Sequence, residues 1–141
     1  MVATQIAGAA RSFPYLGNHV TIHADASDTN GNFAVLEILS KPGAEPPMHV
    51  HDNADEMFIV IEGQMQLTCG TRQSTLSAGE SGIVKRGTPH TFKILTPALR
   101  SMTIFTPAGF EEFFRSLAGE PPPPFEVLAQ AAAKYGSRIL R

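Results

Sequence analysis

The chain has 141 residues, of which 43% are hydrophobic and 17% charged, and its formal net charge is −2. Such a composition suits one globular domain and lacks the clustered basic residues that nucleic acid or anionic membranes require. The single cysteine, Cys69, excludes an intramolecular disulfide. Neither a signal-peptide pattern nor an apolar run of about 20 residues is present, so we expect a cytoplasmic protein that contacts neither nucleic acid nor membrane.

Residues 1–18 have a mixed composition with a turn-like Phe13-Pro14-Tyr15 element, and we interpret them as an N-terminal arm that orders only against a neighbour. From residue 19 onward, short β-rich runs alternate with Gly, Pro, Asn and Asp. Closely spaced short strands of this kind indicate an all-β sandwich or barrel, which we place at residues 19–106. The expected strands are His19–Ala24, Phe33–Leu39, Glu56–Glu62, Gln64–Cys69, Gln73–Leu76, Ser81–Lys85, Thr91–Leu95 and Leu99–Phe105. The segment 28–32 is expected to be an ordinary turn.

Residues 107–141 are predicted to form a C-terminal helical extension. Thr106-Pro107 can begin a helix, and an apolar stripe follows at helical spacing, which is expected to pack on the outside of the barrel or on a partner. The stripe consists of Phe110, Phe113, Phe114 and Leu117. After an extended proline run at 121–124, the Ala-rich segment 125–135 predicts a second helix that ends at Gly136.

A group of histidines and one glutamate predicts a metal site. Side chains two residues apart on a strand share a face, so His49 and His51 can converge on one ion. A short turn leads to Glu56, whose carboxylate completes a two-His, one-carboxylate set that is typical of open metal sites. His90, after the tight turn at 86–89, is the candidate fourth ligand. Four inward polar groups in an apolar barrel would be costly without an ion or a close partner.

These residues resemble a known family. The first cupin motif has the form G-x5-H-x-H-x4-E-x6-G, and the chain matches it at Gly43, His49, His51, Glu56 and Gly63. The second motif, G-x5-P-x-G-x2-H-x3-N, is matched at Gly79, Gly87 and His90, whereas Lys85 and Ile94 stand where proline and asparagine are expected. The chain is similar to small single-domain cupins that are often likened to quercetin 2,3-dioxygenases.

The resemblance implies an all-β cupin jelly-roll barrel with one or two short C-terminal helices, and a homodimer. It also implies one divalent transition metal ion, whose identity (Fe, Ni, Mn, Co, Cu or Zn) the donor set leaves open. By strand parity, residues around the site are expected to form the wall of a small-molecule pocket, although core packing would explain each of them equally well. They are Phe33, Val35, Met48, Phe58, Val60, Phe92 and Met102.

Three functions follow from these expectations. The first is a metal-dependent dioxygenase that acts on a small organic substrate, aromatic or enolic, with Glu56 as both metal ligand and general base. The second is an isomerase, cyclase or decarboxylase that uses the ion as a Lewis acid alone. The third is a cupin that binds a small ligand without turnover.

Overall fold

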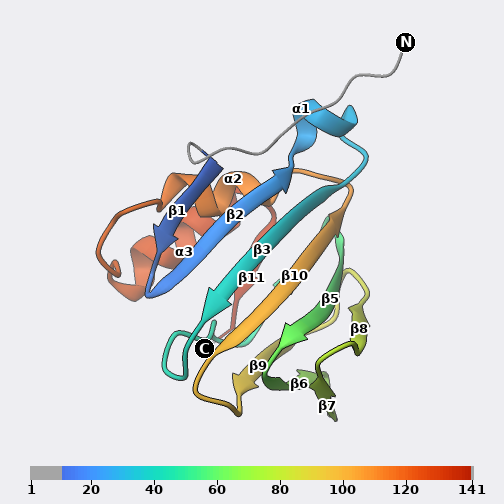
Figure 1. Ribbon diagram of the computed structural model, residues 1–141. Helices are drawn as coiled ribbons and strands as arrows, with labels where there is room; N and C mark the ends of the chain where they lie inside the picture. Colours follow the sequence, from blue (N-terminus) through green and yellow to red (C-terminus); the bar gives the residue numbers. More distant parts are fainter. Residues whose placement is uncertain (1–10, 141) are drawn as a thin grey trace.

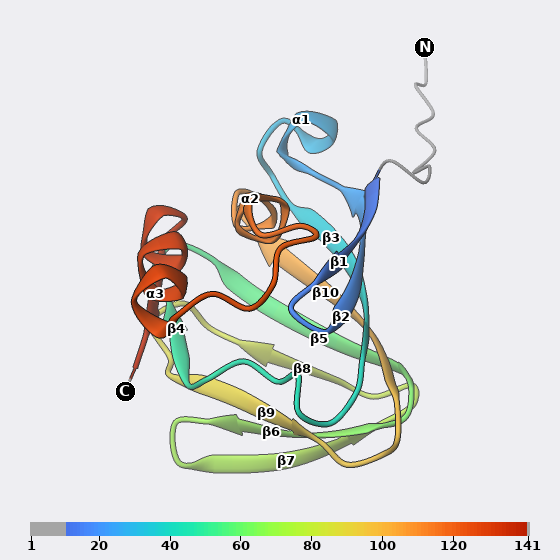
Figure 2. The same ribbon diagram turned by 90° about the vertical axis from the view of Figure 1, so that its left-hand side faces the viewer.

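The computed structural model describes residues 11–140 and contains two antiparallel sheets that face each other (Figures 1 and 2). The first sheet has six strands, in the spatial order β1 (Ser12–Tyr15), β2 (Asn18–Ala24), β3 (Ala34–Ser40), β10 (Leu99–Thr106), β5 (Asp55–Glu62) and β8 (Ser81–Val84). The second has five, in the order β11 (Ser137–Ile139), β4 (His49–His51), β9 (His90–Ile94), β6 (Gln64–Cys69) and β7 (Arg72–Ser77). The predicted all-β jelly-roll fold is confirmed.

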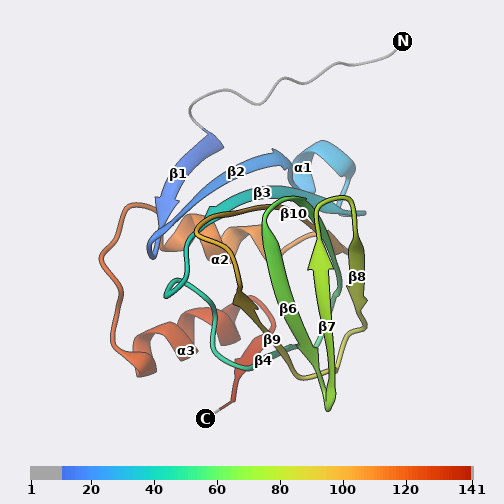
Figure 3. The same cartoon turned by 60° about the horizontal axis from the view of Figure 1, so that its bottom comes forward.

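Three short helices complete the described chain: α1 (Ala26–Thr29), α2 (Glu111–Ser116) and α3 (Phe125–Lys134). Figure 3 shows α2 and α3 together at one side of the two sheets, away from β6, β7 and β8. Within residues 11–140, none of the helices has the length and apolarity needed to cross a membrane. The two predicted C-terminal helices are thus present as short elements.

Strand alternation defines the inner face of the six-stranded sheet. On β10, Ser101, Thr103 and Phe105 are buried, whereas the residues between them are more exposed. Their neighbours on β5 follow the same pattern, because Glu56 and Phe58 are buried opposite Phe105 and Thr103. The buried apolar residues form two clusters, one around β2, β3 and α2 and the other around β5, β6 and β7. The inner faces of both sheets therefore supply the core.

The N-terminal part differs from the sequence expectations in two places. Ser12–Tyr15 forms β1, which pairs with β2, so these residues of the expected arm add a strand to the sheet; residues 1–10 lie outside the described chain. The expected turn at 28–32 begins with the helical turn α1, because Asp25 caps it. The Asp25 carboxylate accepts from the Asp28 amide, and the Asp28 carboxylate accepts from the Asp25 amide.

The C-terminal part also differs. The first helix begins at Glu111 and not at Pro107, because Gly109 has a φ of +142° and donates its amide to the Glu111 carboxylate at 2.6 Å. After α3, the chain forms the strand β11, which pairs with β4. The expected helical extension therefore ends in a strand that lies beside the histidines of β4.

Candidate metal centre

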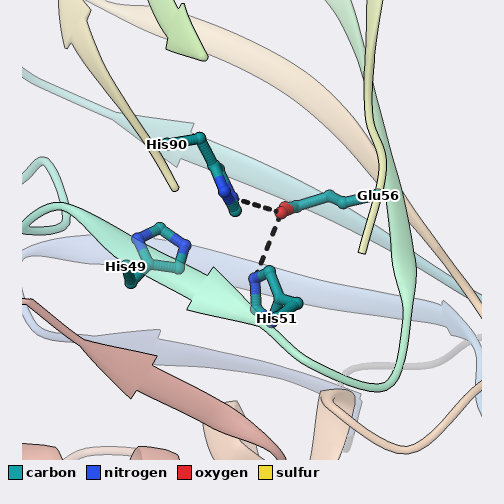
Figure 4. A group of neighbouring side chains, drawn as sticks. All are labelled: His49, His51, Glu56 and His90. Carbon is teal, nitrogen blue, oxygen red and sulfur yellow. Dashed lines mark hydrogen bonds and ion pairs between the residues drawn. The ribbon is translucent and has the colours of Figure 1, made fainter. Parts of the chain in front are cut away.

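Three strands from both sheets bring the predicted ligands together. His49 and His51 lie on β4, where His49 is paired with His90 of the neighbouring β9. Glu56 reaches the same point from β5 in the facing sheet. One ligand atom from each of the four residues lies within 4.8 Å of the others, and Figure 4 shows the side chains pointing toward one another. The cluster that the motif predicted is therefore formed.

Glu56 is the centre of the hydrogen bonding in the cluster (Figure 4). Its Oε1 atom lies 3.0 Å from Nε2 of His90 and 3.2 Å from Nε2 of His51. Burial raises the pKa of the Glu56 carboxyl, but the hydrogen bonds and charges of these two histidines outweigh it and lower the pKa to about 2. The buried carboxylate is therefore ionised at neutral pH.

Backbone carbonyls orient two of the imidazoles. Nδ1 of His49 lies 2.8 Å from the Pro47 carbonyl oxygen, and Nδ1 of His90 lies 3.0 Å from that of Thr88. Because a carbonyl can only accept, each Nδ1 carries the hydrogen and each Nε2 points into the cluster. This is the outer hydrogen bonding that metal-binding histidines usually have.

The histidines differ in their affinity for a proton. Burial, together with the charge of His90, lowers the pKa of His49 to about 4. Burial also opposes protonation of His90, but the hydrogen bond and charge of Glu56 prevail and raise its pKa. A negative carboxylate thus favours a positive charge at this point of an apolar interior.

The donor set fits a transition metal ion. Ligands at right angles around an ion, each at about 2.1 Å, lie about 3.0 Å apart, close to the 3.0 and 3.2 Å between Glu56 and the Nε2 atoms of His90 and His51. Three imidazoles and one carboxylate suit Fe, Ni, Mn, Co, Cu and Zn to differing degrees. The four residues could therefore hold one divalent ion.

A pocket of about 270 Å³ reaches this cluster. His49, His51 and Glu56 line it, whereas His90 lies behind them and is fully buried. Six phenylalanines from both core clusters line it, namely Phe58, Phe92, Phe105, Phe110, Phe113 and Phe114. The apolar stripe of the first C-terminal helix thus faces the pocket as well as the core, and not the outside of the barrel.

The structure places the predicted wall residues in different environments. Phe58 and Phe92 line the pocket, and their rings lie 5.9 Å apart. Val60 is fully buried in the core. Val35 and Met102 alternate with buried neighbours on β3 and β10, which directs them to the outer face of the sheet.

Two further predicted wall residues, Phe33 and Met48, are also absent from the lining of the pocket. Phe33 precedes β3 and is 43% exposed, and Met48 precedes β4 and is half-buried. Phe33 and Met48 could contact a substrate only if the segments that precede β3 and β4 were arranged differently.

Several lining residues were missed by the sequence reasoning. Ser101 and Thr103 of β10 line the pocket, together with Ser40 of β3 and Tyr15 of β1. The signal for β10 was available, because Arg100 marks the outer face and therefore places 101, 103 and 105 inward. No comparable signal marks Tyr15, since β1 was not predicted.

The two facing sheets and the His49, His51, Glu56 and His90 cluster define a double-stranded β-helix protein with a candidate metal site. The family model described as "Cupin domain" matches residues 36–105, which contain all four of these residues. The chain belongs to the cupin superfamily.

Individual relatives are distant. The chain is 26% identical over 101 residues to quercetin 2,3-dioxygenase of Bacillus subtilis (strain 168), a match that covers 72% of this chain and 30% of the relative. The chain spans less than a third of the length of the curated relatives it matches.

Two solved structures share the fold. KdgF from Halomonas sp. has a TM-score of 0.61 at 20% identity, covering 68% of this chain and 84% of that one. Pac13, a nucleoside dehydratase from Streptomyces, has a TM-score of 0.63 at 13% identity, covering 78% and 88%. These similarities establish the fold and leave the activity open.

Proposed function

We propose that the protein holds one divalent transition metal ion through His49, His51, Glu56 and His90 and acts as a dioxygenase-like oxidoreductase. Its substrate would be a small organic molecule with an aromatic or enolic group. The observation that carries the proposal is the position of the cluster, because the pocket of about 270 Å³ reaches three of the four donors. The distant similarity to quercetin 2,3-dioxygenase supports the reaction class.

Each group would contribute a distinct part of the chemistry. A bound ion would supply Lewis acidity and open coordination positions. The Glu56 carboxylate, kept ionised by its histidine neighbours, would accept a proton from a substrate hydroxyl. The phenylalanine-rich wall would exclude water and hold the ring of the substrate against the donors.

The test combines elemental analysis of the purified protein with oxygen-uptake assays on flavonols, diketones and catechols. We expect about one equivalent of a transition metal per chain and product formation that depends on dioxygen. Equal product in air and under anaerobic conditions would contradict the dioxygenase proposal. The variant Glu56→Gln is expected to lose turnover, whereas Glu62→Gln, on the exposed end of the same strand, should retain it.

The other two functions give different results in the same experiments. An isomerase, cyclase or decarboxylase would turn over with redox-inert Zn²⁺ and consume no oxygen. A ligand-binding cupin would show no turnover, and Glu56→Gln would leave its ligand affinity intact.

A further inference from the structure

Outside the histidines of the cluster, the charged groups that line the pocket are all negative. Among the lining residues of the described chain there is no lysine or arginine, and the charged groups are the carboxylates of Glu45 and Glu56 besides the histidines of the cluster. Glu45 is committed to the backbone: it accepts from the Gly43 amide at 2.6 Å and from the Ile94 amide at 3.1 Å. An anionic group away from the four donors would therefore be buried beside carboxylates, without a cation to offset its desolvation.

Uncharged polar groups, by contrast, line the pocket without partners. Ser40, Ser101 and Thr103 are 6%, 5% and 2% exposed. All three line the pocket, and their hydroxyls make no hydrogen bond within residues 11–140. The buried Oδ1 atom of Asn18, another lining residue, also lacks a partner there. A buried polar atom without a partner is uncommon in folded proteins, which makes Asn18 Oδ1 a candidate contact for a ligand. The three hydroxyls face the pocket and are free to hydrogen-bond to the same ligand.

The hydroxyl-bearing residues lie at increasing distance from the cluster along β10 and β3. Phe105 of β10 is paired with Glu56, and Thr103 and Ser101 are the next inward residues along the strand. Each step of two residues covers about 7 Å. Ser40 lies on the adjacent β3, opposite Leu99, one step further on. Figure 1 shows β3 and β10 side by side over this length. A ligand that contacts the donors at one end could thus meet Thr103 and then Ser101.

The remaining wall is apolar, with several aromatic rings, and Tyr15 is neutral. Tyr15 packs against Phe113 and Phe114, with ring centroids 5.9 and 4.8 Å apart. Burial raises the pKa of the Tyr15 phenol well above its usual range, so this group stays uncharged. The pocket is therefore amphipathic, with hydroxyls on the inner face of the six-stranded sheet and aromatic rings from this sheet, from β9 and from α2 around them.

We propose that the pocket selects an uncharged, single-ring molecule with hydroxyl groups along one edge, and that Ser101 and Thr103 determine this specificity. The inference rests on the proposed function, since it names the substrate class of the same site. The volume of about 270 Å³ lies just below the range of about 300–1,000 Å³ that is typical of pockets for drug-sized ligands, which favours one ring. A ring with a carboxylate or phosphate substituent in place of the hydroxyl would be rejected.

The test measures binding and not turnover. The full chain is titrated at pH 7.5 in the presence of a chelator, so that no ion contributes charge, with amide NMR shifts as the readout. Three single-ring probes are compared: 3-hydroxybenzyl alcohol, 3-hydroxybenzoate and toluene. We expect the neutral alcohol to bind at least about tenfold more tightly than the carboxylate. The carboxylate loses its hydration beside Glu45 and Glu56, and no lysine or arginine lines the pocket to offset that loss.

Two variants test the hydroxyls. Thr103→Val, which is nearly isosteric, and Ser101→Ala should each weaken binding of 3-hydroxybenzyl alcohol about three- to tenfold, the usual effect of one hydrogen bond. Both should leave toluene binding unchanged. Ser74→Ala, on the exposed part of β7, is the control and should change neither affinity.

Two results would overturn the inference. One is 3-hydroxybenzoate binding as tightly as the alcohol. The other is equal weakening of toluene and the alcohol by Thr103→Val, since that would indicate a packing role. The titration involves no reaction, so its result is independent of the oxygen-uptake assays. The dioxygenase proposal can fail while the preference for neutral probes holds, and the preference can fail while the dioxygenase proposal holds.

Discussion

Phe110 packs edge-on against His51, with ring centroids 4.5 Å apart and an angle of 78° between the ring planes. Phe110 also stacks on Phe113 at 4.8 Å and contacts Phe105 at 5.3 Å. A predicted metal ligand is therefore held directly by the aromatic core beneath α2. Stability of the core and position of the imidazole are coupled at this contact.

This coupling predicts the behaviour of Phe110→Ala. The variant should lose about 3–5 kcal/mol of unfolding free energy, the usual cost of deleting a buried ring, and should also bind metal more weakly because His51 loses its support. Ile22→Ala is the control, since Ile22 is fully buried in the same cluster and does not line the pocket. Urea unfolding and competitive metal titration measure the two effects. An equal loss of metal affinity in both variants would show that the contact with His51 has no specific role.

Metal loading should depend on pH through the histidines. A ligating imidazole must be unprotonated, and the charge of Glu56 raises the pKa of His90, so protons compete first at this residue as the pH falls. The Glu56 carboxylate, with its pKa lowered to about 2, remains ionised throughout. We expect occupancy to fall below about pH 6, as measured by equilibrium dialysis with elemental analysis. Full occupancy below about pH 4 would contradict the assigned ligands.

A second group of charges, near α1, should control acid stability. Asp25 is 9% exposed and accepts hydrogen bonds from Arg115 at 2.6 Å and from Ser27 at 2.7 Å. Burial raises its pKa, but these hydrogen bonds and the charge of Arg115 outweigh burial and lower the pKa far below its usual range. A lowered pKa in the folded state stabilises the protein above the unfolded value of about 3.9, and this contribution is lost as the pH falls further.

Asp25→Asn should therefore cost about 1–3 kcal/mol at pH 7, and the difference from the wild type should shrink at pH 3. Glu112→Gln provides the control, because Glu112 contacts the same Arg115 from a 43% exposed position. Its cost should stay within about 1 kcal/mol. Urea unfolding at both pH values measures these differences. A penalty for Asp25→Asn that is unchanged at pH 3 would exclude ionisation as its cause.

The clustering of the four candidate ligands could be predicted from the sequence because strand parity and motif spacing are local properties. His49 and His51 needed only a period of two, and Glu56 needed one short turn. Long-range pairing was harder to predict. The strand β11 pairs with β4, with Ser137 opposite His51. This contact joins residues more than 80 positions apart, and no local pattern indicates it. Tyr15 became a pocket residue through the same kind of pairing, between β1 and β2.

The choice of Met102 as a wall residue shows another limit. The position of Met102 in the sequence indicates a strand near the site, but hydrophobicity alone does not distinguish the two faces of β10. Both faces carry apolar residues, because Ile104 and Met102 alternate with Phe105 and Thr103. The inward positions of Ser101 and Thr103 are also hard to predict from their residue types, since polar residues usually lie on the outside.

The outer face of the six-stranded sheet favours a dimer. One apolar row crosses four neighbouring strands in register: Val35, Ile104, Met57 and Ile83. Ile83 is 61% exposed, and monomers rarely leave contiguous apolar patches of this kind open to water. We expect light scattering to give twice the chain mass, and the double variant Met57→Glu, Ile83→Glu to give a monomer. Val127→Glu, at an exposed position on α3, should leave the dimer intact. A monomeric wild type would refute this expectation.

The two outer glycines of the first motif should respond differently to alanine. Both have positive φ, +100° for Gly43 and +90° for Gly63. A Cβ atom at Gly63 would lie 2.4 Å from the Ala98 carbonyl oxygen, whereas at Gly43 it would meet nothing within 4 Å. Gly43→Ala should therefore cost about 1–2 kcal/mol from backbone strain alone, and Gly63→Ala about 3–5 kcal/mol. Thermal unfolding of both variants provides the comparison, and equal costs would show that the contact with Ala98 relaxes freely.

The tight approach of Gly63 to Ala98 has a consequence for how the motif is read across a family. In this chain, the close approach of a hairpin to a neighbouring strand end requires the glycine, and none of the atoms that a Cβ there would meet belongs to the four donors. A descendant that exchanged His49 or His51 for other residues would still need it in order to fold. A match at Gly63 therefore indicates the architecture, whereas a match at the histidines and Glu56 indicates the capacity to bind a metal ion.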